Sequence, residues 1–329
     1  MPRKGKSDLS DNENTRGVHP IRNRAMLANP YGCKENKTNK DMTRNWLCLC
    51  KAILLAFGMT ACEYIHEDLE PCPMGLELTF RYDYNLQRAD MFSDHVGGVT
   101  VYLFDENGRY LMQQSESNTS ANAPLKDKDY TMHFDLQPGR YQYLVLAHQK
   151  GYEEVMASDG AKFRRNEPTT DGTMEDLSVT LDHEASGNTH LVPHGGLPLD
   201  TLWHGMQTTP VEVVLDQITR DTVSLVRNTK QIHVALREID NPSRIDIADY
   251  DLRIIDHNHR LLWDNSVDES KELTYTPYAT WNSNDKPLDG QIGNPGRIAH
   301  ADFMTSRLLY HDRAEDDAIL SIVNKVTGV

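Results

Sequence analysis

The chain has 329 residues, with 34 Lys and Arg against 49 Asp and Glu, and a formal net charge of -15 at pH 7. Residues 1–61 hold 11 basic and 5 acidic residues, a net +6, so the other 268 hold 23 basic and 44 acidic residues, a net -21. Binding to nucleic acid is disfavoured for so acidic a segment, because phosphates are neutralised by clustered Lys and Arg.

The first 41 residues are polar, rich in Lys and Asn, and have no periodic apolar pattern. A composition of this kind buries too little apolar surface to fold, which predicts disorder. We expect this leader to lie outside the true protein, with translation starting at Met42. An unusually long basic region ahead of an export signal is the alternative.

Residues 42–61 have the order of a bacterial lipoprotein signal. Arg44 and Lys51 precede a short apolar run, AILLAFG, and small residues then precede Cys62. The run is far shorter than the roughly 20 residues that span a bilayer, and it matches the apolar region of a cleaved signal better than a buried core helix. We therefore predict that Cys62 becomes the first residue of the mature protein and carries acyl chains.

Cysteine usage fits this interpretation. Three of the five cysteines precede Cys62, so only Cys62 and Cys72 remain in the mature chain. Lipidation consumes the first, so we expect no disulfide framework. A bridge between Cys62 and Cys72 is the competing idea, and it would forbid lipidation.

An acidic tether, 62–73, leads into residues that predict an all-β fold. Strict alternation of apolar and polar residues predicts a half-buried strand over 76–84. Asn107-Gly108 between two β-rich runs predicts a hairpin over 99–114. Strands are also predicted over 130–136, 140–147 and 176–181, and the only plausible helix lies within 85–96.

A Gly-, Pro- and His-containing stretch, 183–205, suggests a boundary between two sandwich domains, 74–200 and 205–329. The second domain is predicted to contain strands over 211–218, 230–236, 250–256, 260–263, 273–276, 304–310 and 318–323. Residues 256–259 are expected to form a hairpin tip, and 282–297 a long polar loop. Short strands spaced by turn signals favour a β-sandwich over alternating strands and helices.

No motif for phosphate binding, serine hydrolysis or zinc proteolysis occurs, so nothing in the sequence argues for an enzyme, a cofactor or a metal. His257 and His259 are expected to be solvated, and the other loosely spaced histidines match no zinc pattern: His183, His190, His194 and His204. A glycan-binding lipoprotein is the alternative function. Its candidate residues are the tryptophans in predicted loops or at strand ends: Trp203, Trp263 and Trp281.

Three segments carry a resemblance to a known family: EDLEPCPMGLELTFRYDYN (67–85), VTVYLFDENG (99–108) and LQPGRY (136–141). Together with a lipoprotein cysteine just ahead of them, these segments resemble the FimB-type fimbrillin-A-associated anchor proteins. The resemblance is dense over 62–150 and thin beyond. The residues before Met42 depart from the family, as does the end at Val329, where relatives continue with further strands.

The resemblance implies an outer-membrane lipoprotein at the cell surface that anchors fimbriae and supports their assembly. It implies two transthyretin-like, Greek-key β-sandwich domains, the second incomplete, and fimbrial subunits as partners. Addition of a β-strand to or from a subunit is the expected mode of binding. The acidic residues after Cys62 are then candidates for a surface-export signal: Glu63, Glu67 and Asp68.

Overall fold

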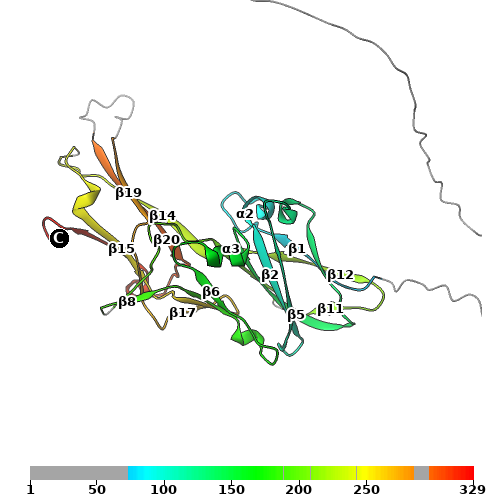
Figure 1. The fold of residues 1–329 in the computed structure, drawn as a ribbon. Helices are drawn as coiled ribbons and strands as arrows, with labels where there is room; N and C mark the ends of the chain where they lie inside the picture. Colours follow the sequence, from blue (N-terminus) through cyan, green and yellow to red (C-terminus); the bar gives the residue numbers. More distant parts are fainter. Residues whose placement is uncertain (1–72, 188, 208, 242, 285–295) are drawn as a thin grey trace, which may run out of the picture. The chain divides into compact units, whose positions relative to one another are not determined.

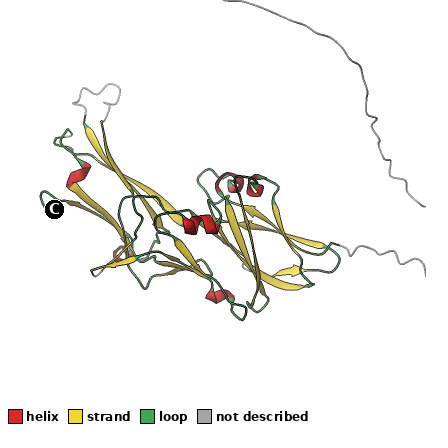
Figure 2. Ribbon diagram, in the orientation of Figure 1, coloured by secondary structure: helices red, strands yellow, loops and turns green. Residues whose placement is uncertain are grey.

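The computed structural model describes residues 73–329, except 188, 208, 242 and 285–295. The described residues belong to one compact unit that consists mostly of β-strands (Figure 1; Figure 2), which confirms the all-β fold class. The first ten strands are β1 (Gly75–Arg81), β2 (Gly98–Asp105), β3 (Tyr110–Ser117), β4 (Thr131–Phe134), β5 (Gly139–His148), β6 (Phe163–Asn166), β7 (Ser178–Leu181), β8 (Glu184–Ser186), β9 (Thr189–Leu191) and β10 (Leu202–Met206). The later strands are β11 (Val211–Val213), β12 (Ile218–Ser224), β13 (Val226–Arg227), β14 (Thr229–Leu236), β15 (Tyr250–Asp256), β16 (Arg260–Leu262), β17 (Val267–Asp268), β18 (Leu273–Tyr275), β19 (Ala279–Asn284), β20 (Arg297–Ser306) and β21 (Ile319–Asn324).

Helices are few and short in the described residues. The α-helices are α2 (Phe92–His95) and α3 (Tyr152–Ala157), of which only α2 falls in a stretch where a helix is predicted. The 3-10 turns are η1 (Pro124–Lys126), η2 (Met174–Asp176), η3 (Ile247–Asp249) and η4 (Ala314–Asp316). Within this part of the chain, no helix has the length and apolar character needed to cross a bilayer.

The alternation predicted for the first strand is present in β1. Leu76, Leu78 and Phe80 are buried in an apolar cluster, while Glu77 and Thr79 are more accessible. The strand ends at Arg81 and not at residue 84, because the following loop turns away and is held by its own side chains. β1 pairs in parallel with β12 and antiparallel with β4, so it lies at the centre of a three-stranded sheet.

The largest sheet has the order β13-β10-β5-β2-β3, with β11 also paired to β5. Along β2, Val99, Val101 and Leu103 belong to one apolar cluster, whereas Tyr102 and Phe104 belong to another. β5 and β10 alternate in the same way. Because successive side chains of a strand point to opposite faces, apolar residues cover both faces of this sheet.

The two clusters attach the other sheets to this one. The first cluster combines one face of the large sheet with side chains of β12-β1-β4. The second combines its other face with side chains from three sheets, β14-β20-β19, β21-β15-β18-β9-β8 and β17-β16-β7-β6. Buried apolar area contributes roughly 25 cal/mol per Å2 to the stability of the folded state. Because the large sheet buries apolar side chains on both faces, it stabilises both cores.

The sheets do not divide at the expected boundary between residues 200 and 205. β10, β11 and β13 pair with strands of the large sheet or with one another, and β12 pairs with β1. Conversely, β7 and β9, from the first predicted domain, pair with β16 and β18, from the second. Strands from each predicted domain therefore complete sheets of the other.

Local turn signals predicted where the chain turns better than they predicted which strands pair. The hairpin of β2 and β3 is confirmed, with Gly108 at φ 77° in the tight turn. Between the strands predicted over 130–136 and 140–147, a turn at Pro138-Gly139 carries the chain from β4, in the sheet of β1, to β5, in the large sheet. The hairpin tip predicted at 256–259 is wrong, because the strands on either side of it, β15 and β16, belong to different sheets.

Two boundaries in the second strand series also differ. Of the strand predicted over 304–310, only 304–306 is strand, as the end of the longer β20 that begins at Arg297, and residues 307–310 are not in a strand. The strand predicted over 211–218 is divided into β11 and the start of β12 by a turn in which Asp216 has φ 59°. The polar loop predicted over 282–297 lies mostly outside the described residues.

The exchange of strands predicts the behaviour of a shortened chain. Residues 73–200 alone should show no cooperative thermal unfolding, because they lack β12, the partner of β1, and core side chains such as Trp203 and Val223. Circular dichroism during heating measures this, with residues 73–329 as the control. A sharp transition in the shorter chain would show that its core closes without the later strands.

Candidate functional site

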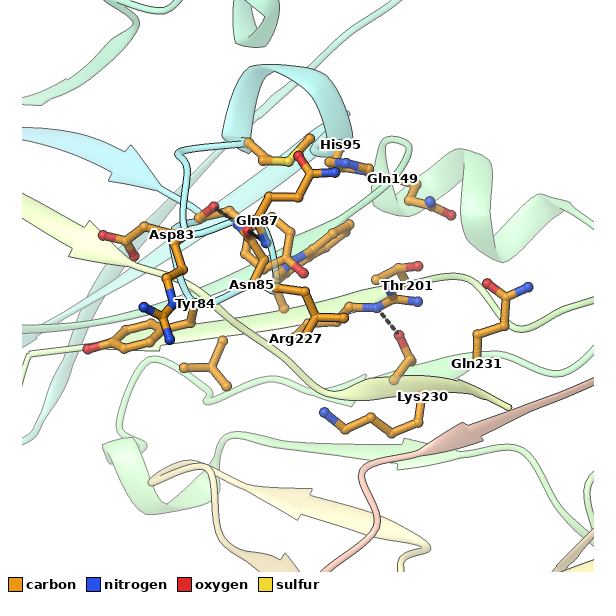
Figure 3. Close-up of a pocket in the computed structure, with 17 residues that line it drawn as sticks. Asp83, Tyr84, Asn85, Gln87, His95, Gln149, Thr201, Arg227, Lys230 and Gln231 are labelled. Carbon is orange, nitrogen blue, oxygen red and sulfur yellow. Dashed lines mark hydrogen bonds between the residues drawn. The ribbon is translucent and has the colours of Figure 1, made fainter. Parts of the chain in front are cut away.

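A groove of about 840 Å3 lies beside the C-terminal end of β1 (Figure 3). One wall is the loop from Tyr82 to Met91, and the other is made by β10, β13 and the start of β14. Its lining combines aromatic rings, amides, hydroxyls and cations: Tyr82, Tyr84, Trp203, Asn85, Gln87, Gln149, Gln231, Thr201, Thr229, Arg88, Arg227 and Lys230.

Side-chain hydrogen bonds give the groove loop its shape. The Asn85 amide donates to the carbonyl oxygens of Tyr82 and Ala89 at 2.7 and 2.8 Å. The Asp90 carboxylate accepts from the backbone N–H groups of Tyr82 and Phe92 at 2.9 and 3.0 Å. Asn and Asp commonly satisfy backbone groups in this way where a strand ends. The loop is therefore shaped by its own residues.

Aromatic residues form the deep part of the groove and its rim. The rings of Tyr82 and Trp203 are both buried and meet edge to face, with centroids 5.6 Å apart. Tyr84 and Leu86, by contrast, are strongly exposed on the loop. The groove thus has an apolar floor and an exposed apolar rim.

Two cations of the groove, Arg227 and Lys230, are not paired with an acid of the described chain, although Asp83 also lines the groove. No ion pair between described residues includes Arg227 or Lys230, although Arg227 Nε donates to Thr229 Oγ1 at 3.2 Å. Burial lowers the pKa of Lys230, and the positive charges of Arg227 and Arg307 lower it further. This cluster favours ligand groups that carry acceptor oxygens.

A second candidate site is the free edge of β21. This strand pairs with β15, from Tyr250↔Asn324 to Ile255↔Ile319, and is the last strand in its sheet (Figure 1). Its outer edge pairs with no strand among the residues that the structure covers. Four of its six side chains are exposed and apolar: Ile319, Leu320, Ile322 and Val323.

Edge strands usually carry features that block further pairing, such as charge, proline or short length. The sequence of β21, ILSIVN, has neither charge nor proline. At the opposite edge of the same sheet, β8 is only three residues long and begins with Glu184. β21 is therefore the edge of this sheet best suited to accept another strand.

The predicted site residues next to the lipoprotein cysteine are not tested. Cys62, Glu63, Glu67 and Asp68 all lie outside the described residues, as does Cys72. Lipidation and surface export thus remain predictions from the sequence.

The histidines take more definite positions than expected. His257 is exposed, but the prediction that His259 is solvated is wrong, because it is buried near His183, with ring centroids 6.0 Å apart. His190 lies 5.4 Å from His183, and Lys271 Nζ donates to His183 Nε2 at 3.0 Å. Within the described chain, no group of three metal-ligating side chains is placed to hold an ion.

The three tryptophans proposed from the sequence differ in exposure. Trp203 is 1% exposed, so the idea that it lies on the surface is wrong: it belongs to a core strand. Trp263 is half-buried, and its carbonyl oxygen accepts a hydrogen bond from His204. Trp281 is 40% exposed on β19. The groove and the β21 edge were not predicted, because both depend on which strands become neighbours.

Comparison with known proteins gives a family match over residues 69–329, to the fimbrillin-A associated anchor proteins Mfa1 and Mfa2. A search of curated proteins gives no match. Among solved structures, a candidate adhesin of Bacteroides thetaiotaomicron is 27% identical, with a TM-score of 0.64 and 80% of each chain covered. A candidate polysaccharide-binding protein of the same species is 28% identical, with a TM-score of 0.58 and 78% of each chain covered.

A third solved structure, the fimbrial anchor protein Mfa2 of Porphyromonas gingivalis, is 17% identical, with a TM-score of 0.52. The match covers 78% of this chain and 80% of that one. At this identity the likeness concerns the fold.

His204 predicts acid sensitivity. It is buried on β10, and burial lowers its pKa to about 4, against about 6.5 for an unfolded histidine. Between these values the unfolded state binds a proton that the folded state does not. Stability should therefore fall as pH falls from 6.5 to 4, by up to about 3 kcal/mol from this residue.

Urea unfolding at pH 7 and pH 4.5 measures this loss. His204→Gln keeps an amide donor for the Trp263 carbonyl and should reduce the difference in unfolding free energy between the two pH values. His257→Gln, at an exposed position, is the control and should leave the difference unchanged. An identical pH dependence in His204→Gln and the wild type would contradict the assignment.

Proposed function

Because the chain belongs to the fimbrillin-A associated anchor protein family, we propose that it anchors fimbriae to the outer membrane and binds their first subunit by strand addition at β21. The family match, over residues 69–329, supports fimbrial association. The acyl anchor on Cys62 and the use of β21 are the specific parts of the proposal.

The membrane attachment follows from the lipoprotein signal. Each buried acyl methylene contributes about 0.8 kcal/mol, so a single chain binds reversibly whereas two or more give stable anchoring. A cysteine at the start of the mature chain places this anchor directly before the acidic tether that leads to β1. Glu63, Glu67 and Asp68 in that tether would direct the protein to the outer surface.

The exposed edge of β21 is the observation that carries subunit binding. In strand addition, main-chain hydrogen bonds provide affinity, and alternate side chains provide register. Ile319 and Val323 lie on one face of the strand, and Leu320 and Ile322 on the other, all of them exposed. An incoming strand would therefore extend the sheet and cover apolar side chains on both of its faces.

A charged variant of β21 tests the subunit site. Leu320→Lys with Val323→Lys should abolish co-purification of the fimbrial subunit. Lysines on an edge strand oppose pairing with another strand, and the double variant also lacks the apolar contacts that Leu320 and Val323 would make with the subunit. Both side chains are exposed, so the melting temperature should change little. Affinity purification from fimbriated cells is the measurement.

The control is Ile239→Lys, which places a lysine at a 91% exposed position outside β21. It should retain the subunit. Equal recovery of the subunit with the control and the double variant would contradict the use of β21. The membrane anchor is tested separately, by a cysteine variant.

A cysteine variant tests the anchor. Cys62→Ala should lose metabolic labelling by palmitate and leave the detergent phase of a membrane extract, whereas Cys72→Ala should keep both. Intact mass spectrometry of the wild type should give residues 62–329 plus acyl chains. Continued labelling of Cys62→Ala would show that the acyl chains are attached to another residue, which would contradict the proposed anchor.

A further inference from the structure

Three rings gather on the solvent-facing side of the sheet β14-β20-β19. Trp281 stacks on His300, with centroids 4.9 Å apart and ring planes 11° from parallel. His233 completes the group, 5.1 Å from His300 and 5.5 Å from Trp281. Figure 1 shows the three strands side by side, and their pairing places Trp281 directly opposite His300.

A chain of hydrogen bonds fixes the two imidazoles. His233 Nδ1 lies 2.6 Å from Asp302 Oδ1, and His233 Nε2 lies 3.1 Å from His300 Nδ1. His300 Nε2 lies 2.7 Å from Ser283 Oγ. One direction satisfies every contact with neutral rings: Ser283 donates to His300, His300 donates to His233, and His233 donates to Asp302.

The core does not need this arrangement. The buried side of the same sheet is formed by Ala299, Ala301 and Phe303, whereas Trp281 is 40% exposed on the other side. An aromatic surface whose orientation is already fixed loses little conformational entropy when a ligand binds. The rings are thus held in place at a position where they remain accessible to a ligand.

We propose that Trp281, His300 and His233 form a platform that binds a neutral polysaccharide. The flat indole would stack against the C–H face of a hexose ring, while sugar hydroxyls bond polar groups around it. Gln231, on β14, and Tyr278, just before β19, provide such groups, and their side chains are hydrogen bonded to each other at 3.2 Å. Three strands spaced at ~4.8 Å give the platform a width of about 10 Å.

The charges at the platform favour a neutral glycan. Asp302 Oδ1 already accepts a hydrogen bond from His233, so that oxygen is not free to bind a cationic ligand. The chain as a whole carries a net charge of -15, which opposes a polyanion. Hydroxyl groups are the remaining partners that match this surface.

A protein partner fits this surface less well. Stable protein interfaces bury about 800 Å2 on each partner, with an apolar centre. Here the rings are bordered by small or polar residues, such as Ala235, Ser283 and Gln231, and the exposed aliphatic residues lie instead on β21. The platform is therefore a site separate from the subunit edge, and it does not depend on the anchoring function.

Titration with neutral polysaccharides tests the proposal. Residues 73–329 are titrated with β-glucan, α-mannan and galactan, followed by calorimetry and by tryptophan fluorescence. At least one should bind the wild type, and Trp281→Ala should weaken that binding about tenfold or more, which corresponds to 1.4 kcal/mol. His300→Ala, which removes the support under the indole, should weaken it less, and Trp281→Phe should retain part of it.

Tyr310→Ala is the control, because it removes a 90% exposed aromatic side chain elsewhere and should bind as the wild type does. Unchanged melting temperatures would exclude unfolding as the cause. Absence of binding to all three glycans, or equal binding by Trp281→Ala, would overturn the proposal. So would loss of fimbrial-subunit recovery in Trp281→Ala without any effect on glycan binding, which would assign the rings to a protein interface.

Discussion

The large sheet is the constraint on which the other parts of this structure depend. Most strands of a sandwich bury one face, but β2 and β5 bury both, so a single sheet closes two apolar cores. Gly97, just before β2, and Gly98, its first residue, permit the close approach of the segment after β5, since a Cβ there would lie 2.0 Å from the carbonyl oxygen of Gln149 and 2.4 Å from that of Lys150. Side-chain volume at these positions would separate β2 from the segment after β5.

Local features of the fold could be predicted from the sequence, because they depend on residues close together in the chain. The alternation in β1 and the Asn-Gly turn between β2 and β3 both appear as expected. Pairing partners could not be predicted, because alternation determines which face a side chain occupies but not which strand lies beside it. Glu77 meets Arg220, 143 residues later, in a parallel pair for which no local signal exists.

The same limit applies to the candidate sites. Trp281 could be identified as an exposed aromatic residue, but its stacking on His300 requires β19 and β20 to be neighbours. Trp203 looked equivalent in the sequence, yet it lies in the core because β10 is inserted between β5 and β13. Residue type therefore indicated the candidate chemistry, whereas strand order decided which candidates were accessible.

The pairing of β1 with β12 also affects how quickly the chain can fold. Loop-closure entropy must be overcome before such a distant contact contributes any stability, and proteins dominated by non-local pairing fold in milliseconds to seconds. Until residue 224 is available, the apolar face of β1 lacks one of its two neighbours. In a newly made chain, β1 is therefore open to non-native pairing for as long as the later strands are still being made.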